Sequence, residues 1–434
     1  MTVTMALCPP RVRCGRATFL LVLTVTFLVL PLAWRHRTVP LDLTRFHFDA
    51  SGIYKASPPP LVLALVVVPF AAVGSEWPSS RAASPVCLAT HASADRAAAV
   101  LEALAAWSGP ASVALFDPEP PRLTAHFIAR LRAGSPEAHR RVALHAIFPA
   151  DGSPAAGAGE GDGGRRRNQS GQLLYPQNLA RNTAVQRCPS EWTLVADADM
   201  VAPPSLRRRL TAFLGATRPR RRIAYVLPTY EVERSPGPPP DSKAQLMRLK
   251  GEGKARPFHA TVFQPNQGAT QLSRWESRRA PGDDVISVAH AVRHFPFWYE
   301  PVYAARHGGP PFDERFVGYG MTRNTQAYEM FLRGYTFEVL DNAFLIHWGF
   351  QERKQRPPWR EEQSRRNYRL FQNWVLEKAA QYDADPEDII EKMAGDQRRR
   401  KVEVRRKNQR KTKKRPPWPV GTSDNRTAGR SSPT

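Results

Sequence analysis

The chain has 434 residues, a formal net charge of +24 at pH 7 and 41 prolines. This length can bury one large core or two modest ones. It therefore excludes the class of small domains that need several disulfides or a metal ion to fold. The charge is concentrated, since residues 397–415 carry twelve Lys or Arg and one Glu. Only Trp418 follows this basic run as an aromatic residue, so base stacking has little support and we expect no nucleic-acid partner.

Residues 17–33 form an uncharged apolar run, interrupted by three threonines, of about the shortest length that spans a bilayer. Basic residues stand on both sides of the run, so charge leaves its orientation open. A cleaved signal peptide is the competing interpretation, but no small-residue cleavage site follows. We expect a short cytosolic tail (1–16), a transmembrane signal anchor (17–33) and a lumenal remainder.

Cysteines and glycosylation sequences fit that topology. Cys87 and Cys188 would both be lumenal and could form one disulfide, although two buried free thiols fit the sequence equally well. Asn168 and Asn425 each begin an Asn-x-Ser/Thr sequence in a polar stretch. Both are therefore predicted N-glycosylation acceptors if they lie in the lumen.

The lumenal part begins with a predicted stem, residues 34–83. Within it, residues 61–73 are apolar but too few to span a membrane. They are either a buried segment or an irregular part of the stem. Residues 84–395 have the pattern of a folded domain, and we expect the basic tail, 396–434, to be disordered.

Strands and helices alternate through the first half of this domain. Short runs of β-formers predict strands, and apolar residues at helical spacing predict the helices between them. We expect strands at 86–90, 111–116, 142–148, 192–196 and 223–228, with helices at 95–107, 123–132, 175–186, 207–214 and 243–250. The alternation predicts βαβ units and a mostly parallel sheet in an α/β fold.

The second half is less regular. Aromatic side chains crowd residues 294–305, which suits strands that line a cleft, or equally packing in the core. A helix is expected at 325–333, with short strands at 337–340 and 344–347. Apolar residues at helical spacing then predict a core-packing helix at 361–380.

Two carboxylates, Asp197 and Asp199, follow the predicted strand at 192–196. Ligands of open α/β sheets bind beyond the carboxyl ends of the strands. Two carboxylates there can share a hard divalent cation, which keeps coordination sites open for substrate phosphates. The same spacing is also common in ordinary solvated loops, so the motif alone is weak.

Four blocks of sequence resemble glycosyltransferase family 49, the family that contains β-1,4-glucuronyltransferase 1 and the second catalytic domain of LARGE. The resemblance covers roughly residues 84–380, and its later blocks are the more specific ones. The matching segments are residues 84–94 with 107–116, 175–182 with 197–200, 299–303 with 312–320, and 334–340 with 344–350.

The resemblance implies a GT-A fold with a Rossmann-like sheet that binds a UDP-sugar on Mn²⁺, although Mg²⁺ would suit the same ligands. It implies that Asp197, Asp199 and His347 are metal ligands, and that Arg181 and Asn182, with Asp197, face the donor nucleotide. Without the family, His347 would more often be a hydrogen-bonded core residue. Arg181 could equally be a helix-surface arginine paired with a carboxylate.

An inverting transfer needs a base for the acceptor hydroxyl. Asp313 and Glu314, in a turn framed by Gly and Pro, are the predicted candidates, and loop ion pairs or helix capping are the alternative. A glucuronyl donor also needs a cation for its carboxylate, which Arg315, Arg323 or Lys354 could supply.

The sequence therefore predicts a Golgi type II glycosyltransferase. The expected reaction moves glucuronate from UDP-glucuronate to a terminal sugar, possibly xylose, of a glycoprotein glycan. A different UDP-sugar donor, a non-catalytic Golgi partner protein, or a binder of acidic polymers through the tail are the alternatives. Association with other Golgi transferases, as a homo- or hetero-oligomer, is compatible with the sequence.

Overall fold

The computed structural model describes residues 65–80, 84–93, 96–118, 121–149, 174–218, 220–278, 282, 284–352 and 358–390. The chain divides into two units, Met1–Ala56 and Ser57–Thr434, and every described residue belongs to the second. The expected anchor, Asn168, Asn425, Lys354 and the basic tail all lie outside the described residues. No helix in the described ranges combines the length and apolar character needed to cross a membrane.

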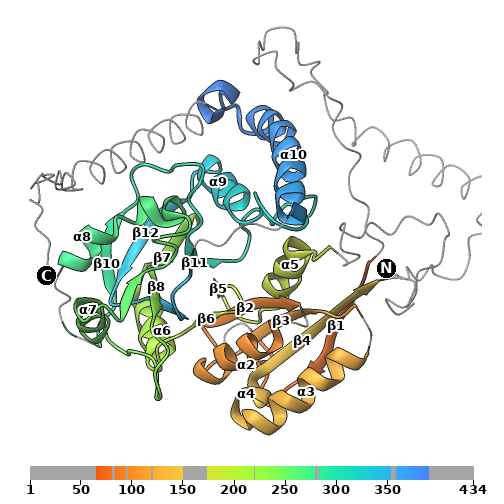
Figure 1. Ribbon diagram of the computed structural model, residues 1–434, viewed down its shortest axis with the longest axis vertical. Coiled ribbons are helices and arrows are strands. Elements are labelled where there is room, and N and C mark those ends of the chain that lie inside the picture. The colour runs from red at the N-terminus through yellow and green to blue at the C-terminus, as the bar shows by residue number, and fades with distance from the viewer. Residues whose placement is uncertain are drawn as a thin grey trace, which may run out of the picture. The chain divides into compact units, whose positions relative to one another are not determined.

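A nine-stranded mixed sheet forms the centre of this unit, in the order β1-β4-β3-β2-β5-β11-β7-β12-β10 (Figure 1). Strands β4, β3, β2, β5, β7 and β12 run in one direction, and β1, β11 and β10 run in the other. The predicted α/β class with a mostly parallel sheet is confirmed. The strands are β1 (Leu65–Val73), β2 (Val86–Ser93), β3 (Ala111–Phe116), β4 (Val142–Pro149), β5 (Trp192–Val195), β7 (Ile223–Leu227), β10 (Ser287–Ala291), β11 (Val302–Arg306) and β12 (Thr336–Asp341).

A smaller four-stranded sheet continues from the end of β5, in the order β6-β13-β8-β9. Its strands are β6 (Met200–Val201), β8 (Thr229–Val232), β9 (Ala255–Pro257) and β13 (Leu345–Trp348). A parallel sheet whose Asp-x-Asp turn leads into a second small sheet is the arrangement expected of a GT-A fold. The sequence predicted only β13 of these four strands, because the other three are two to four residues long and lack a clear pattern.

Helices cover both faces of the large sheet, because successive side chains of its strands point to opposite sides. On β2, Val86 and Leu88 pack with helices α2, α3 and α6, whereas Cys87 and Ala89 pack with α5. Helices α9 and α10 bury a third, aromatic-rich cluster against β11, β7 and β12. The helices are α2 (Ala97–Ala106), α3 (Arg122–Gly134), α4 (Pro136–Arg141), α5 (Gln177–Arg187), α6 (Leu206–Ala216), α7 (Lys243–Gly251), α8 (Leu272–Ser277), α9 (Asn324–Leu332) and α10 (Pro358–Tyr382), with a 3₁₀ helix η4 (Gln264–Thr270).

Strand β1 lies within the segment predicted as stem, so the sheet begins at residue 65 rather than near residue 84. It pairs with β4 as an antiparallel edge strand, which explains why half-exposed valines recur along it. The pairing is interrupted between Val68 and Ala72, and there the backbone N–H of Phe70 donates to Nδ1 of the buried His145. The apolar segment therefore belongs to the folded unit.

The aromatic segment at 294–305 also differs from prediction, since only Val302–Arg306 is a strand. Phe295, Phe297 and Tyr299 are almost fully buried in the cluster that α9 and α10 cover. The interpretation as core packing is therefore confirmed for these three side chains. The other predicted strands and helices are present, with ends that differ by a few residues.

Candidate active site

The end of β5 brings two of the predicted metal ligands together. After β5 the chain turns through Asp197 and Asp199 and enters β6, where Met200 pairs with His347 of β13. This register places Nε2 of His347 3.7 Å from Oδ2 of Asp199. The small sheet therefore explains how a histidine nearly 150 residues away reaches the Asp-x-Asp turn.

The hydrogen bonds of His347 suit a metal ligand. Its Nδ1 donates to the carbonyl of Gly349, so Nε2 is the accepting nitrogen; it receives the side-chain amide N–H of Gln351, which a bound metal ion would displace. Such a bond at the other ring nitrogen fixes the tautomer that binds metals. The carboxylate of Glu231 holds this region, since it accepts hydrogen bonds from Arg256, His259 and Gln351.

Asp197 faces two guanidinium groups and one histidine, whose pKa burial lowers to about 4. Its Oδ1 accepts hydrogen bonds from Nη2 of Arg323 at 2.7 Å and of Arg181 at 3.1 Å, and Nε2 of His91 lies 3.5 Å away. Burial by itself would raise the pKa of Asp197, but Arg323 and Arg181 hold it well below its usual range. Asp197 is therefore ionised, and the side-chain hydrogen bonds and ion pairs that it forms with described residues fall on Oδ1.

Asp199 is held differently. Burial and the neighbouring charge of Asp197 raise its pKa, while His347 and Arg96 oppose the shift. Two carboxylates of unequal proton affinity beside Nε2 of His347 fit a divalent cation in their chemistry. No group of three His, Cys, Asp or Glu side chains in the described ranges is already gathered as a complete metal site.

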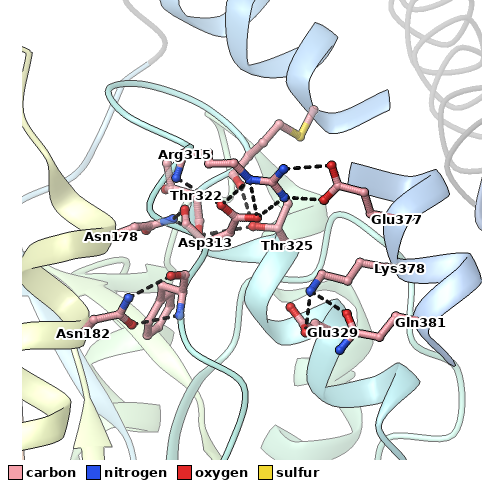
Figure 2. Close-up of polar contacts among 12 residues, drawn as sticks. Asn178, Asn182, Asp313, Arg315, Thr322, Thr325, Glu329, Glu377, Lys378 and Gln381 are labelled. Atoms are coloured by element: carbon pink, nitrogen blue, oxygen red, sulfur yellow. Dashed lines mark hydrogen bonds and ion pairs between the residues drawn. The ribbon is translucent and has the colours of Figure 1, made fainter. Parts of the chain in front are cut away.

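The two predicted donor-binding residues on α5 have separate roles. Arg181 is buried, and besides Asp197 it donates to Oδ1 of Asn178. Asn182 instead exchanges hydrogen bonds with the backbone of Phe312 and donates to Glu314. Only Arg181 therefore contacts the Asp-x-Asp turn, and Asn182 fixes the loop that follows β11 (Figure 2).

The two predicted bases, Asp313 and Glu314, lie in this loop. The carboxylate of Asp313 binds the guanidinium of Arg315, which also pairs with Glu377 of α10 (Figure 2). Glu314 accepts from the Asn182 amide at 2.8 Å. Neither carboxylate contacts Asp197 or Asp199 within the described part of the chain. Their role as base remains a prediction from the sequence.

Glu300 is a carboxylate that the sequence did not single out. It precedes β11, three residues before Tyr303, which pairs with Val195 of β5. The next residue, Pro301, offers its carbonyl to Nη1 of Arg323. Burial raises the pKa of Glu300 to about 7, with Arg323 opposing and Asp197 adding to the shift. No described residue gives its carboxylate a hydrogen bond or ion pair.

Of the three predicted cations for a sugar carboxylate, Arg323 lies at the site and Arg315 lies with Asp313. His91, Arg323 and Glu300 gather around Asp197 only because β2, α9 and β11 meet there. Their spacing in the sequence carries no signal of this meeting. The sequence named Arg323 only as a candidate for the sugar carboxylate, and finding His91 and Glu300 would have required the β2–β5 and β5–β11 pairings.

A disulfide joins Cys87 of β2 to Cys188, directly after α5. The sequence left pairing and two free thiols open, and the structure has the bonded form. The bond ties the helix that carries Arg181 to the strand that carries His91. It therefore braces two of the elements that supply partners to Asp197.

Residues 85–383 match the family model described as glycosyl-transferase for dystroglycan. The chain belongs to this family of glycosyltransferases. It is 33% identical to mouse β-1,4-glucuronyltransferase 1 over 324 residues, which cover 69% of this chain and 77% of that protein. The zebrafish (Danio rerio) protein of the same name is 29% identical, with 69% and 75% covered.

A more distant relative is the mouse xylosyl- and glucuronyltransferase LARGE2. It is 30% identical over 268 residues, which cover 60% of this chain and 34% of that protein. Among solved structures, Staphylococcus aureus TarS 1–349 in complex with UDP aligns with a TM-score of 0.39 at 11% identity, over 72% of this chain and 70% of that chain. That score is low, so the description of the fold rests on the sheets themselves.

Proposed function

We propose that the chain is an inverting, metal-dependent glucuronyltransferase that moves glucuronate from UDP-glucuronate to a terminal sugar of a glycoprotein glycan, with xylose as the first acceptor to test. The observation that carries the proposal is the meeting of Asp197, Asp199, His347 and Arg181 beyond the carboxyl end of β5. The relatives named for glucuronyl transfer supply the donor class. The position suits a nucleotide-sugar, since open α/β sheets bind ligands at this edge.

Asp199 and His347 would hold the divalent cation. Oδ2 of Asp197, which belongs to the same Asp-x-Asp turn, would be available as a further ligand. When bound, Mn²⁺ would neutralise the diphosphate of the departing nucleotide. Mg²⁺ would suit the carboxylates, but an imidazole ligand favours Mn²⁺ over Mg²⁺. Arg181 and Arg323 would keep Asp197 ionised and in place.

The acceptor hydroxyl must lose its proton as its oxygen attacks the anomeric carbon and the bond to the UDP oxygen breaks. Both sequence candidates are already engaged, Asp313 by Arg315 of the same loop and Glu314 by Asn182 of α5. Glu300 has a carboxylate free of partners among the described residues and lies beside the Arg323–Asp197 pair. We therefore propose Glu300 as the group that accepts this proton.

A Golgi location with a lumenal catalytic unit completes the proposal. The disulfide between Cys87 and Cys188 supports an oxidising compartment, because such bonds seldom persist in the cytosol. The apolar segment at 17–33 would then serve as the anchor.

The test is UDP release by the purified full chain, measured over a panel of UDP-sugars with Mn²⁺, with and without a β-xyloside. We expect acceptor-dependent release from UDP-glucuronate alone, and its loss on addition of a chelator. Release from another donor would keep the glycosyltransferase but reject the glucuronyl assignment. A folded protein that releases UDP from no donor would favour the non-catalytic Golgi partner.

A further inference from the structure

A second concave site lies at the opposite end of the strands from Asp197, at the amino ends of β7 and β12. It is a pocket of about 360 Å³, and no Asp or Glu lines it. Its polar lining consists of Arg221, Arg222, Arg306, His307, Arg333 and Tyr335. The wall of this pocket therefore carries four guanidinium groups and no carboxylate, and has an excess of positive charge.

The topology explains why these residues meet. Arg221 and Arg222 directly precede β7, and Arg333 shortly precedes β12, its parallel neighbour, whose Thr336 pairs with Ile223. Strand β11 runs antiparallel to β7, so its last residue, Arg306, reaches the same edge. Three segments that are distant in sequence therefore bring their cations to the amino ends of β7 and β12.

The described contacts compensate only part of this charge. Nη2 of Arg306 binds Glu191 at 2.6 Å, and its guanidinium lies over the ring of Trp192. Nη1 of Arg222 donates to the backbone carbonyl of Arg333. The side chains of Arg221 and Arg333 form no hydrogen bond or ion pair with the described residues. By contrast, the neighbouring Arg220 is paired with Glu338 and lies outside the pocket wall.

We infer that this pocket binds a tetrahedral oxyanion, a phosphate or sulfate group, and because the chain belongs to a glycosyltransferase family the carrier to test is a saccharide. Guanidinium groups match such oxygens with paired N–H donors, and convergent arginines are the usual receptor for them. A flat basic surface would hold the same charges apart in water. Here they line a concavity that also offers the Tyr335 hydroxyl and the turn at Gly308.

The pocket is separate from the candidate active site and does not depend on the proposed function. Arg306 pairs in the sheet with Trp192, at the start of β5, whereas Asp197 follows the end of that strand. Five residues of extended chain correspond to about 16 Å. An anion bound in the pocket would therefore lie outside contact range of the Asp-x-Asp turn.

The test is calorimetric titration of the full chain with inorganic phosphate, inorganic sulfate, a sulfated oligosaccharide and its neutral counterpart. Saturating UDP and Mn²⁺ would be present so that donor-site binding of phosphate does not contribute. The variant is Arg221→Gln with Arg333→Gln, and the matched control is Arg208→Gln with Arg248→Gln, two exposed arginines away from the pocket. Neither substituted pocket side chain supports a described contact, so the variant should fold, which circular dichroism would verify.

We expect one saturable site for the sulfated oligosaccharide, at least tenfold weaker in the pocket variant and unchanged in the control variant. Anion binding by the basic tail would persist equally in all three proteins. Binding of inorganic anions without binding of the oligosaccharide would overturn the saccharide assignment. Equal binding by wild type and pocket variant would overturn the site altogether.

Discussion

The two ends of the strands in the central sheet, called here the carboxyl edge and the amino edge, differ in how their charged side chains are paired. At the carboxyl end of β5, Asp197 lies among Arg181, Arg323 and His91, and Asp199 lies opposite His347. At the amino ends of β7 and β12, four arginines line a pocket that has no carboxylate in its wall, and the nearby Glu191 and Glu338 are paired with Arg306 and Arg220.

The comparison shows that local charge and binding capacity are different properties. The carboxyl edge is rich in ion pairs, and its remaining capacity for a ligand is Oδ2 of Asp197, the Asp199 carboxylate and Nε2 of His347 once the Gln351 amide is displaced. At the amino edge, the side chains of Arg221 and Arg333 lack hydrogen-bond and ion-pair partners among the described residues, and the inferred capacity is for an external anion. The first site is stabilised by a disulfide and reciprocal hydrogen bonds. The side chains of the second site are positioned only by the strand ends that carry them.

The largest expected effect is at the carboxyl edge. Asp199→Asn should lower kcat/KM for UDP-sugar turnover by roughly 10²–10³-fold, the scale of losing one preorganised electrostatic contact in the transition state. Steady-state UDP release and Mn²⁺ titration would measure it. Asp284→Asn, at an exposed carboxylate paired with Arg208, is the matched control and should leave turnover unchanged. Normal turnover in Asp199→Asn would remove the metal assignment.

A second experiment distinguishes the base that we propose from those that the sequence predicts. Glu300→Gln should lower kcat by about 10²-fold or more, the usual contribution of a general base, with little change in UDP affinity. Glu314→Gln keeps a hydrogen-bonding side chain beside Asn182 and should have a small effect. Single-turnover kinetics would compare the two. A larger loss in Glu314→Gln, or in Asp313→Asn, would return the assignment to the loop.

A third experiment removes the disulfide that stabilises the carboxyl edge. The Cys87–Cys188 bond closes a loop with a sequence separation of 101. Cys188→Ser should therefore cost about 2–4 kcal/mol of unfolding free energy, measured by urea denaturation. Cys8→Ser, outside the described residues, is the control. Equal stability of the two variants would show that the bond does not brace this edge.

The smallest effects contrast single arginines at the two edges. Arg181→Gln leaves Asp197 with one fewer hydrogen bond and should destabilise the fold by about 1–3 kcal/mol. Arg221→Gln should change stability by less than about 0.5 kcal/mol, with a slight gain at low salt that fades as salt screens the neighbouring arginines. Thermal unfolding at two ionic strengths would measure both. A destabilised Arg221→Gln would mean that the pocket contains an internal partner.

The sequence predicted the first half of the fold well because its signals are local. Runs of β-formers at 111–116 and 142–148 are buried strands, and the predicted helix between them, α3, has a clear apolar face, whereas the short α4 buries only Ala138 and was not predicted. The segment at 294–301 misled because aromatic residues favour both strands and cores. Strand β1 was missed because an edge strand is only half buried, and its thirteen-residue apolar run resembled a stem irregularity.

The candidate site was predictable only where one motif carried it. Asp197 and Asp199 stand together in the sequence, and His347 was placed with them by family resemblance, which the β6–β13 register supports. Glu300, His91 and the arginine pocket depend on which strands are neighbours and in which direction they run. No spacing along the chain encodes that information.

One side chain, Asn178, connects the loop after β11 to the Asp-x-Asp turn. Its amide N–H groups donate to the carbonyls of Asp313, near the middle of that loop, and of Thr322, close to its end at α9, and its oxygen accepts from Arg181, which holds Asp197. The second half of the loop is thus fastened to α5 at two points. A substrate that displaces this loop would also disturb Asn178 and, through it, Arg181. Acceptor binding and donor binding would then be coupled, and by linkage the coupling acts equally in both directions.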